Sequence, residues 1–265
     1  MLLKRIAVAL LVGLPACTQG ALPAATPPAA TPPALAPHAA AQPAASAAAA
    51  PATADAGSPS PPEHSHVCGS AHHRFKNAAK WAKIFDDPSR DEWQKPAAVI
   101  QALALSPDAR VVDIGAGTGY FTVRLARAVP RGKVVAVDIE PTLLQYIDHR
   151  AQKEHLGNVS TALGNAKSPN VKGPIDLALV VDTYHHIEDR PAYFHGVLHE
   201  LSPHGRVVIV DFRMGKLPVG PPEKHRIPPE QTTREMKQAG YKKCGSYDKL
   251  PYQYVLEFGL RCQAG

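Results

Sequence analysis

The second half of the chain alternates between runs of apolar residues and segments in which apolar residues recur at helical spacing. The apolar runs have the length and β-branched content of buried strands, and they cover residues 111–114, 133–137, 159–163, 175–181 and 206–212. The segments of helical spacing follow the first, second and fourth runs, over residues 120–129, 141–154 and 191–201. Strands that alternate with helices in this way predict an α/β fold around a parallel sheet.

The end of the chain has the pattern of one more helix and two more strands. The helix is predicted over residues 230–239, with Gly240 placed as its C-terminal cap. Two aromatic-bearing strands follow, at about 241–247 and 252–261. We therefore expect residues 105–265 to form a Rossmann-like, doubly wound sheet of seven strands with helices on both faces.

Residues 63–104 have a different pattern. Aromatic and apolar residues, among them Trp81, Phe85 and Trp93, recur at helical spacing on either side of a polar turn at 86–91. One or two amphipathic helices that pack on the domain would explain this pattern. We expect a helical N-terminal extension here.

The first 17 residues resemble a bacterial lipoprotein signal. Lys4 and Arg5 precede an apolar run that is too short to span a bilayer, and Cys17 follows a small residue. Lipidation of Cys17 would anchor the protein in a membrane, while plain secretion and no export are the alternatives. Residues 18–62 are mostly Ala and Pro and bury too little to offset their ordering entropy, so they predict a disordered tether.

Charge and metal-ligating residues add little to this picture. The net charge of +6 is spread without a basic run, so the sequence indicates neither nucleic acid nor a polybasic membrane contact. Side chains that could ligate zinc or copper gather after the tether, at His64, His66, Cys68, His72 and His73. Their spacing matches no established zinc finger, so we expect a polar linker end and no metal site. Cys244 and Cys262 could form a disulfide if the domain is exported.

The first strand runs into a turn rich in glycine. Asp113 is followed by glycines at alternate positions, Gly115, Gly117 and Gly119. Glycine is needed where the chain turns with positive φ or where a ligand must approach the backbone closely. A dinucleotide fingerprint would need G-x-G-x-x-G, and Tyr120 occupies the position of its last glycine. The pattern therefore disfavours a pyrophosphate site.

An acid followed by alternate glycines after a strand resembles the first motif of class I S-adenosylmethionine (SAM) methyltransferases. The resemblance covers roughly residues 110–262 and implies that Asp113 helps to hold the cofactor's ammonium group. Asp138 ends the second strand and matches the acid that accepts both ribose hydroxyls. The residues expected to bind SAM are Asp113, Gly115, Ala116, Gly117, Gly119, Tyr120, Asp138, Ile139, Asn165, Ala166 and Asp182.

The resemblance also bears on the acceptor side of the site. Asn165 stands where the family usually carries an acid on the adenine amino group, and its side-chain oxygen can still accept a hydrogen bond. His185 and His186 follow the fourth strand, close to where the family transfers the methyl group, and either could act as a general base. In this family the segment before the first strand often forms a lid, which here would involve His73, Arg74, Trp81, Trp93 and Gln94.

We expect direct, in-line transfer of a methyl group from SAM to a small-molecule acceptor, without a metal or a covalent intermediate. The alternatives are an exported SAM-fold binding or scaffold module without catalytic activity, and a nucleotide-dependent oxidoreductase or polyamine-synthase-like enzyme. Export to the periplasm conflicts with the cytoplasmic supply of SAM. A start downstream of Met1, for example at a non-AUG codon for Val67, would leave the protein in the cytoplasm. The sequence does not indicate the oligomeric state.

Overall fold

The structure is a computed structural model that describes residues 77–262. The expected signal segment at 1–17, the tether at 18–62 and the block of histidines with Cys68 lie outside the described residues. His73 and Arg74, expected in a lid, also lie outside them.

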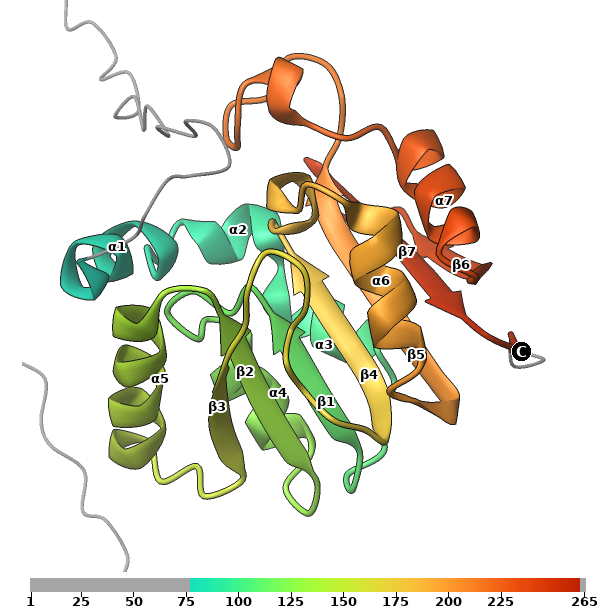
Figure 1. Ribbon diagram of the computed structural model, residues 1–265. Helices are drawn as coiled ribbons and strands as arrows, with labels where there is room; N and C mark the ends of the chain where they lie inside the picture. Colours follow the sequence, from blue (N-terminus) through green and yellow to red (C-terminus); the bar gives the residue numbers. More distant parts are fainter. Residues whose placement is uncertain (1–76, 263–265) are drawn as a thin grey trace, which may run out of the picture. The chain divides into compact units, whose positions relative to one another are not determined.

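A seven-stranded sheet forms the centre of the domain (Figure 1), in the order β3-β2-β1-β4-β5-β7-β6. The strands are β1 (Arg110–Ile114), β2 (Lys133–Asp138), β3 (Val159–Leu163), β4 (Ile175–Val181), β5 (Leu201–Phe212), β6 (Lys242–Tyr247) and β7 (Gln253–Gly259). The first five strands are parallel, and β7 lies antiparallel between β5 and β6. This arrangement confirms the predicted doubly wound α/β sheet of seven strands.

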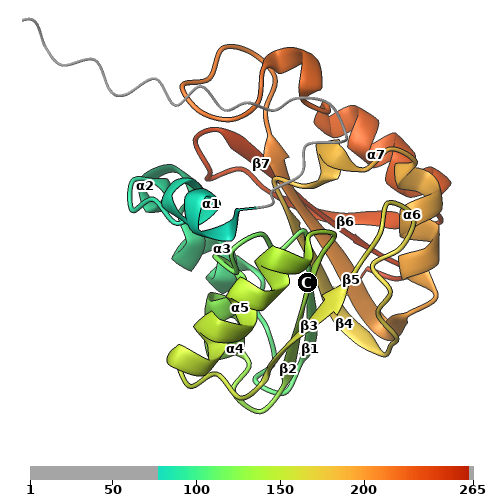
Figure 2. The ribbon, with the colours of Figure 1, turned by 60° about the vertical axis from the view of Figure 1, so that its left-hand side comes forward.

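Helices cover both faces of the sheet, because alternate residues of each buried strand point to opposite sides. In β4, Leu177 and Leu179 pack toward α3 (Pro96–Ala102) and α4 (Thr122–Ala128). Ala178 and Val180 pack toward α6 (Arg190–Leu198) and α7 (Pro229–Gln238). Figure 2 shows α4 and α5 (Pro141–Lys153) on one side of the sheet and α6 and α7 on the other.

The N-terminal extension consists of three short helices where the sequence predicts one or two. They are α1 (Ala78–Phe85), α2 (Arg90–Gln94) and α3. The polar turn predicted at 86–91 is shorter than expected, because Arg90 already begins α2. Lys95 joins α2 to α3 in the left-handed backbone region (φ 45°), directly before Pro96.

The predicted boundary between α6 and β5 is wrong. The sequence predicts a helix to Leu201 and a strand from residue 206, with a turn between them, but α6 ends at Leu198 and β5 begins at Leu201. The backbone N–H of Ile175 donates to the carbonyl oxygen of Glu200 (2.9 Å), which draws this segment into the sheet. The register then jumps from Leu201 beside Ile175 to Arg206 beside Leu177, so the expected turn is an irregularity within a strand.

The C-terminal end of the domain follows the predictions more closely. Gly240 has φ +99° two residues after the end of α7, as expected of a C-terminal cap. Cys244 and Cys262, which the sequence allows to pair, form a disulfide that joins β6 to the residues after β7. Among residues 77–262, none of the helices has the length and apolar character needed to cross a membrane.

Candidate active site

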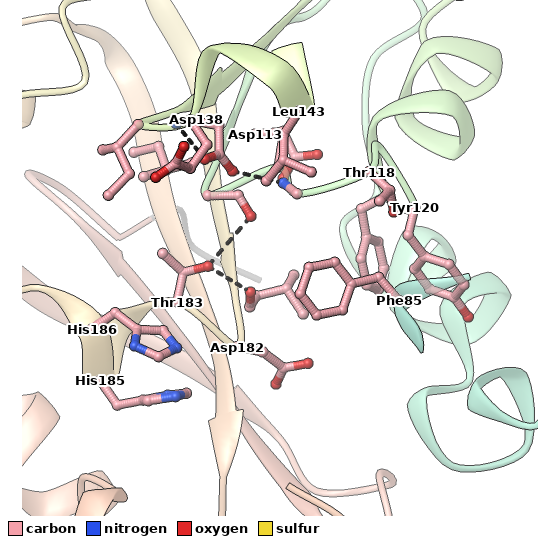
Figure 3. A pocket seen from close by; sticks show the side chains of 18 of the residues that line it. Phe85, Asp113, Thr118, Tyr120, Asp138, Leu143, Asp182, Thr183, His185 and His186 are labelled. Carbon is pink, nitrogen blue, oxygen red and sulfur yellow. Dashed lines mark hydrogen bonds between the residues drawn. The ribbon is translucent and has the colours of Figure 1, made fainter. Parts of the chain in front are cut away.

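A cavity of about 640 Å³ opens at the carboxyl ends of β1, β2 and β4 (Figure 3). All of the residues predicted to bind the cofactor or act in catalysis line this cavity, with the exception of Gly119. Its volume lies in the range usual for pockets that hold small molecules. Ligands of open α/β sheets bind at this edge, beside the point where the strand order reverses.

The glycine turn adopts the backbone conformation that the sequence predicts. Gly115, Gly117 and Gly119 have φ of +75°, +58° and +80°. A Cβ atom at Gly115 would lie 2.2 Å from Thr183 Oγ1, so glycine is required where the loops after β1 and β4 meet. A Cβ atom at Gly119 would lie 3.1 Å from the Ile147 side chain. Gly119 therefore serves the packing of the turn on α5, which explains why it does not line the cavity.

Asp113 is a buried carboxylate at the end of β1, with only 2% of its surface exposed. The Thr122 hydroxyl donates to its Oδ2 at 2.6 Å. Burial raises the pKa of Asp113 to about 6, and the Thr122 hydrogen bond opposes this shift. A cationic group in the cavity would favour the ionised form.

Asp138 lies at the end of the neighbouring strand, and both of its oxygens accept backbone hydrogen bonds. The N–H of Gly117 donates to Oδ2 at 2.9 Å, and the N–H of Glu140 donates to Oδ1 at 3.0 Å. Burial raises the pKa of Asp138, while the hydrogen bond from Gly117 opposes the shift. A carboxylate has about four lone-pair sites, so two hydroxyl donors can still be accepted beside these two N–H groups.

Asn165, which the sequence predicts near the adenine, lies at the exposed rim of the cavity with two other predicted SAM-binding residues, Ile139 and Ala166. Ile139 is 55% exposed, and Asn165 and Ala166 are also exposed. The side-chain oxygen of Asn165 accepts from the N–H groups of Lys167 (2.8 Å) and Ser168 (3.0 Å). The side-chain oxygen that the sequence predicts to contact the adenine thus already stabilises the loop after β3. The contact with the adenine stays a prediction.

Asp182 follows β4 and joins three parts of the fold. Its backbone has φ +52°, which is uncommon for a residue with a side chain. Its carboxylate accepts from Arg90 Nη2 of α2 (3.3 Å) and from the Gln253 side chain of β7. Gln94 Nε2 donates in turn to Gln253 Oε1 at 2.8 Å. Burial raises the pKa of Asp182 to about 7, against the lowering effect of Arg90.

His185 and His186 form a short 3₁₀ helix, η1 (Tyr184–His186), after Asp182. The Nδ1 atom of His185 lies 2.9 and 3.0 Å from the two oxygens of Asp211, a residue of β5 that has no exposed surface. Asp211 also accepts from the N–H groups of His185 (3.2 Å) and Phe212 (2.8 Å). The ring of His186 lies beside that of His185, with centroids 4.2 Å apart. Figure 3 shows both histidines across the cavity from Phe85 and Tyr120.

The extension supplies aromatic walls to the cavity. Trp81 and Phe85 stack with their ring centroids 5.3 Å apart, and Trp93 lies 5.8 Å from Phe212. Both predicted lid tryptophans line the cavity. Gln94 does not line it, because its buried side chain reaches Gln253 instead.

The sequence analysis did not identify Thr183, Arg90 and Asp211 as residues of the site. Thr183 stands between the loops after β1 and β4, and its hydroxyl donates to the carbonyl oxygen of Val181 at 2.9 Å. Arg90 and Asp211 contact Asp182 and His185 from distant parts of the chain. Asp211 could have been identified from the sequence, because it is the only charged residue in the apolar run 207–212. Arg90 left no comparable signal, because it lies in a segment that is polar throughout.

Metal ligands do not gather in the part of the chain that the structure describes. Between residues 77 and 262, no group of three or more His, Cys, Asp or Glu side chains is placed to hold a metal ion.

Comparison with known proteins points in one direction. A family model described as a methyltransferase domain matches residues 105–259. The ubiquinone/menaquinone biosynthesis C-methyltransferase UbiE of Teredinibacter turnerae is 30% identical over 123 residues, which make up 45% of this chain and 49% of that protein. The magnesium-protoporphyrin O-methyltransferase of Rhodobacter capsulatus is 43% identical over 75 residues, or 28% of this chain and 32% of that protein. The chain thus spans about half, or less, of the length of these curated relatives.

Two solved structures have a similar fold. A SAM-dependent methyltransferase from Aquifex aeolicus superposes with a TM-score of 0.65 and 22% identity, over 69% of this chain and 97% of that chain. The magnesium protoporphyrin IX methyltransferase of Synechocystis, solved with bound S-adenosylhomocysteine (SAH), gives a TM-score of 0.53 and 15% identity, over 68% of this chain and 92% of that chain. At these identities the likeness concerns the fold.

Proposed function

Because this chain belongs to the methyltransferase-domain family, whose model matches residues 105–259, we propose that it transfers the methyl group of SAM to a small-molecule acceptor by direct displacement. SAM is the cofactor of this class of methyltransferases. The observation that carries the proposal is the arrangement of Asp113 and Asp138. These two buried carboxylates end the neighbouring strands β1 and β2 and flank one glycine turn in one cavity.

The residues of the cavity fit the chemistry of this cofactor. Asp113 would pair with the ammonium group of the methionine part, since burial leaves its carboxylate in need of a cationic partner. Asp138 would accept the ribose hydroxyls beside the two N–H groups that it already accepts. A dinucleotide is disfavoured because Tyr120, a buried aromatic residue, stands where its fingerprint needs glycine.

Methyl transfer asks the protein mainly for orientation and for the exclusion of water. When bound, SAM supplies a methyl group attached to a sulfonium, which is already a good leaving group. Trp81, Phe85 and Trp93 of the extension line the cavity and would keep water from the reacting atoms. Thr183 and the glycine turn fix the floor of the cavity through their close approach.

His185 is the residue that we assign as the proton acceptor. Asp211 lies against Nδ1 of His185, and this contact favours the tautomer in which Nε2 accepts a proton. Asp211 would also stabilise the imidazolium that forms when an acceptor hydroxyl, thiol or amine loses its proton. The ring of His186 lies beside that of His185, and His186 would shape the cavity there.

The acceptor is proposed only by class. The curated relatives carry names that specify methylation of carbon in quinone biosynthesis and of oxygen on a porphyrin. These names differ in the attacked atom, and the matches span half or less of each relative. A small molecule whose nucleophilic atom can reach His185 is the class that the cavity supports.

We also place the enzyme outside the cytoplasm, as a lipoprotein anchored through Cys17 and facing the periplasm. The basic, apolar and small-residue order of the first 17 residues supports this location. The Cys244–Cys262 disulfide supports it as well, because such bonds persist in oxidising compartments. If translation starts downstream of the signal, the location is cytoplasmic.

Calorimetric titration with SAM, SAH and NAD tests the cofactor. We expect micromolar binding of SAM and SAH and no binding of NAD. Asp138→Ala should weaken SAM binding by about 10- to 100-fold, because charged hydrogen bonds to the ribose are lost. Asp108→Ala, which removes an exposed carboxylate outside the cavity, is the matched control. Binding of NAD in place of SAM would favour the oxidoreductase alternative.

A screen of phenols, thiols and amines for SAH formation would then identify an acceptor and test His185. With that acceptor, His185→Gln should lower the rate of transfer by about 10²- to 10⁴-fold and leave the affinity for SAM unchanged. His186→Gln, on the same short helix, is the control and should keep most of the activity. Full turnover by His185→Gln would show that this histidine is not the base.

A further inference from the structure

The cavity has many acidic side chains and very few cationic ones. Five carboxylates line it, those of Asp113, Asp138, Glu140, Asp182 and Glu188. Within residues 77–262, Arg90 is the single Lys or Arg side chain that lines it. SAM has a carboxylate on its methionine part, and this group would meet unfavourable charge unless a cation stands beside it.

Arg90 is held beside the glycine turn by contacts on several sides. Its guanidinium lies 4.1 Å from the centroid of the Tyr120 ring and 5.9 Å from that of Trp93. Its Nη1 donates to the carbonyl oxygen of Phe85 at 2.8 Å, and its Nε donates to Gln94 Oε1 at 2.9 Å. These contacts fix the planar group in one orientation, as bidentate recognition of a carboxylate requires.

The guanidinium also retains the capacity to bind a ligand. Its contact with Asp182 is 3.3 Å long, whereas charge-assisted hydrogen bonds are usually about 2.7–2.9 Å. Three of its five N–H groups donate in the hydrogen bonds described above, so two remain. Arg90 lowers the pKa of both Asp113 and Asp182, which places its charge near the ends of β1 and β4.

From this geometry we infer that Arg90, contributed by the N-terminal extension, binds the methionine carboxylate of SAM. The inference rests on SAM being the cofactor of the proposed function. The methionine part would then lie between Asp113, which takes its ammonium group, and Arg90, which takes its carboxylate. The carboxylate would accept from the two N–H groups of Arg90 that remain, while Asp182 keeps its hydrogen bond from Gln253. A residue outside the matched segment 105–259 thus completes the cofactor site.

Decarboxylated SAM is the probe that isolates this contact, because it keeps the sulfonium, ribose and adenine and lacks the carboxylate. Wild-type protein of the full chain should bind SAM about 10- to 100-fold more tightly than decarboxylated SAM, as expected for a charged hydrogen-bonded pair. In Arg90→Met this preference should disappear: SAM binding weakens by that factor, and binding of decarboxylated SAM changes less than about twofold. Arg90→Lys should retain part of the preference, since it keeps the charge without the planar fork.

Lys83→Met is the matched control, because it removes a cation of the same extension that is exposed and lies outside the cavity. It should leave the affinities for both ligands unchanged. Unaltered binding of decarboxylated SAM by Arg90→Met also shows that this variant is folded. The inference is overturned if Arg90→Met still prefers SAM, or if it weakens both ligands by the same factor. A wild-type protein that binds neither SAM nor SAH would instead overturn the proposed function.

Discussion

Asp113 illustrates how a single residue can be unfavourable for the fold and useful for the site. Its carboxylate is almost completely buried, and the Thr122 hydroxyl is the hydrogen-bond donor that holds it. Burial raises its pKa to about 6. Ionisation of Asp113 is therefore less favourable in the folded, ligand-free protein than in the unfolded chain, and at neutral pH this difference lowers the stability of the fold. A cationic ligand group would recover part of that cost on binding.

This cost predicts how stability depends on pH. Because the folded-state pKa of Asp113 is raised, its contribution to stability is present below pH 4 and is lost as the pH rises through about 6. Asp113→Asn cannot ionise, so at pH 8 its free energy of unfolding should exceed that of the ligand-free wild type by about 1–3 kcal/mol. The difference should vanish near pH 4, and SAM should bind the variant more weakly.

Urea unfolding followed by circular dichroism between pH 4 and pH 8 measures this difference. Asp248→Asn is the control, because that carboxylate is 76% exposed and lies outside the cavity. A stabilisation of Asp113→Asn that does not vary with pH would show that the ionisation of Asp113 is not its cause.

At the scale of elements, the extension is part of the site although it lies outside the matched domain. Asp86 at the end of α1 accepts from Thr118 Oγ1 (3.1 Å) and from Arg150 Nη1 (3.0 Å). Asp91 of α2 accepts from the Tyr120 hydroxyl and pairs with Arg124 (3.2 Å). These contacts attach α1 and α2 to the glycine turn and its helices, so one wall of the cavity is built by residues before position 105.

The sequence predicted those features of the site that depend on local rules. Asp113 and Asp138 each end an apolar run, and parallel strands place their carboxyl ends at one edge of a sheet. The turn at Gly115, Gly117 and Gly119 needs positive φ, and glycine adopts it readily. The number of strands and the segments that form helices could be predicted for the same reason, because hydrophobic periodicity is a property of short segments.

Contacts between distant segments were not predictable in this way. Arg90 reaches Asp182 across 92 residues, and His185 reaches Asp211 across 26, so neither pair has a spacing that a local rule could detect. The end of α6 was misplaced for a related reason. The backbone pairing of Glu200 with Ile175 across the sheet determines that boundary. The helical spacing of apolar residues contains no information on this pairing.

At the scale of the whole molecule, the cysteines connect location with stability. The disulfide joins Cys244 of β6, at the edge of the sheet, to Cys262, which is 18 residues further along the chain. A loop of this length stabilises a domain by about 2–4 kcal/mol, mainly by restricting the unfolded chain. In a reducing cytoplasm the thiols would be free and this contribution would be absent.

The proposed periplasmic lipoprotein therefore has a defined count of reactive thiols. Without reductant, a maleimide-polyethylene glycol reagent should label the full chain in the membrane fraction once, at Cys68, because lipid would block Cys17 and the disulfide would block the other two. A chain that lacks residues 1–17 should stay in the cytoplasm and be labelled three times.

Reductant should lower the free energy of unfolding of the oxidised protein by about 2–4 kcal/mol and leave that of the double variant Cys244→Ser/Cys262→Ser unchanged. A full chain found in the cytoplasm with all of its thiols free would contradict export, and the supply of SAM would then need no further explanation.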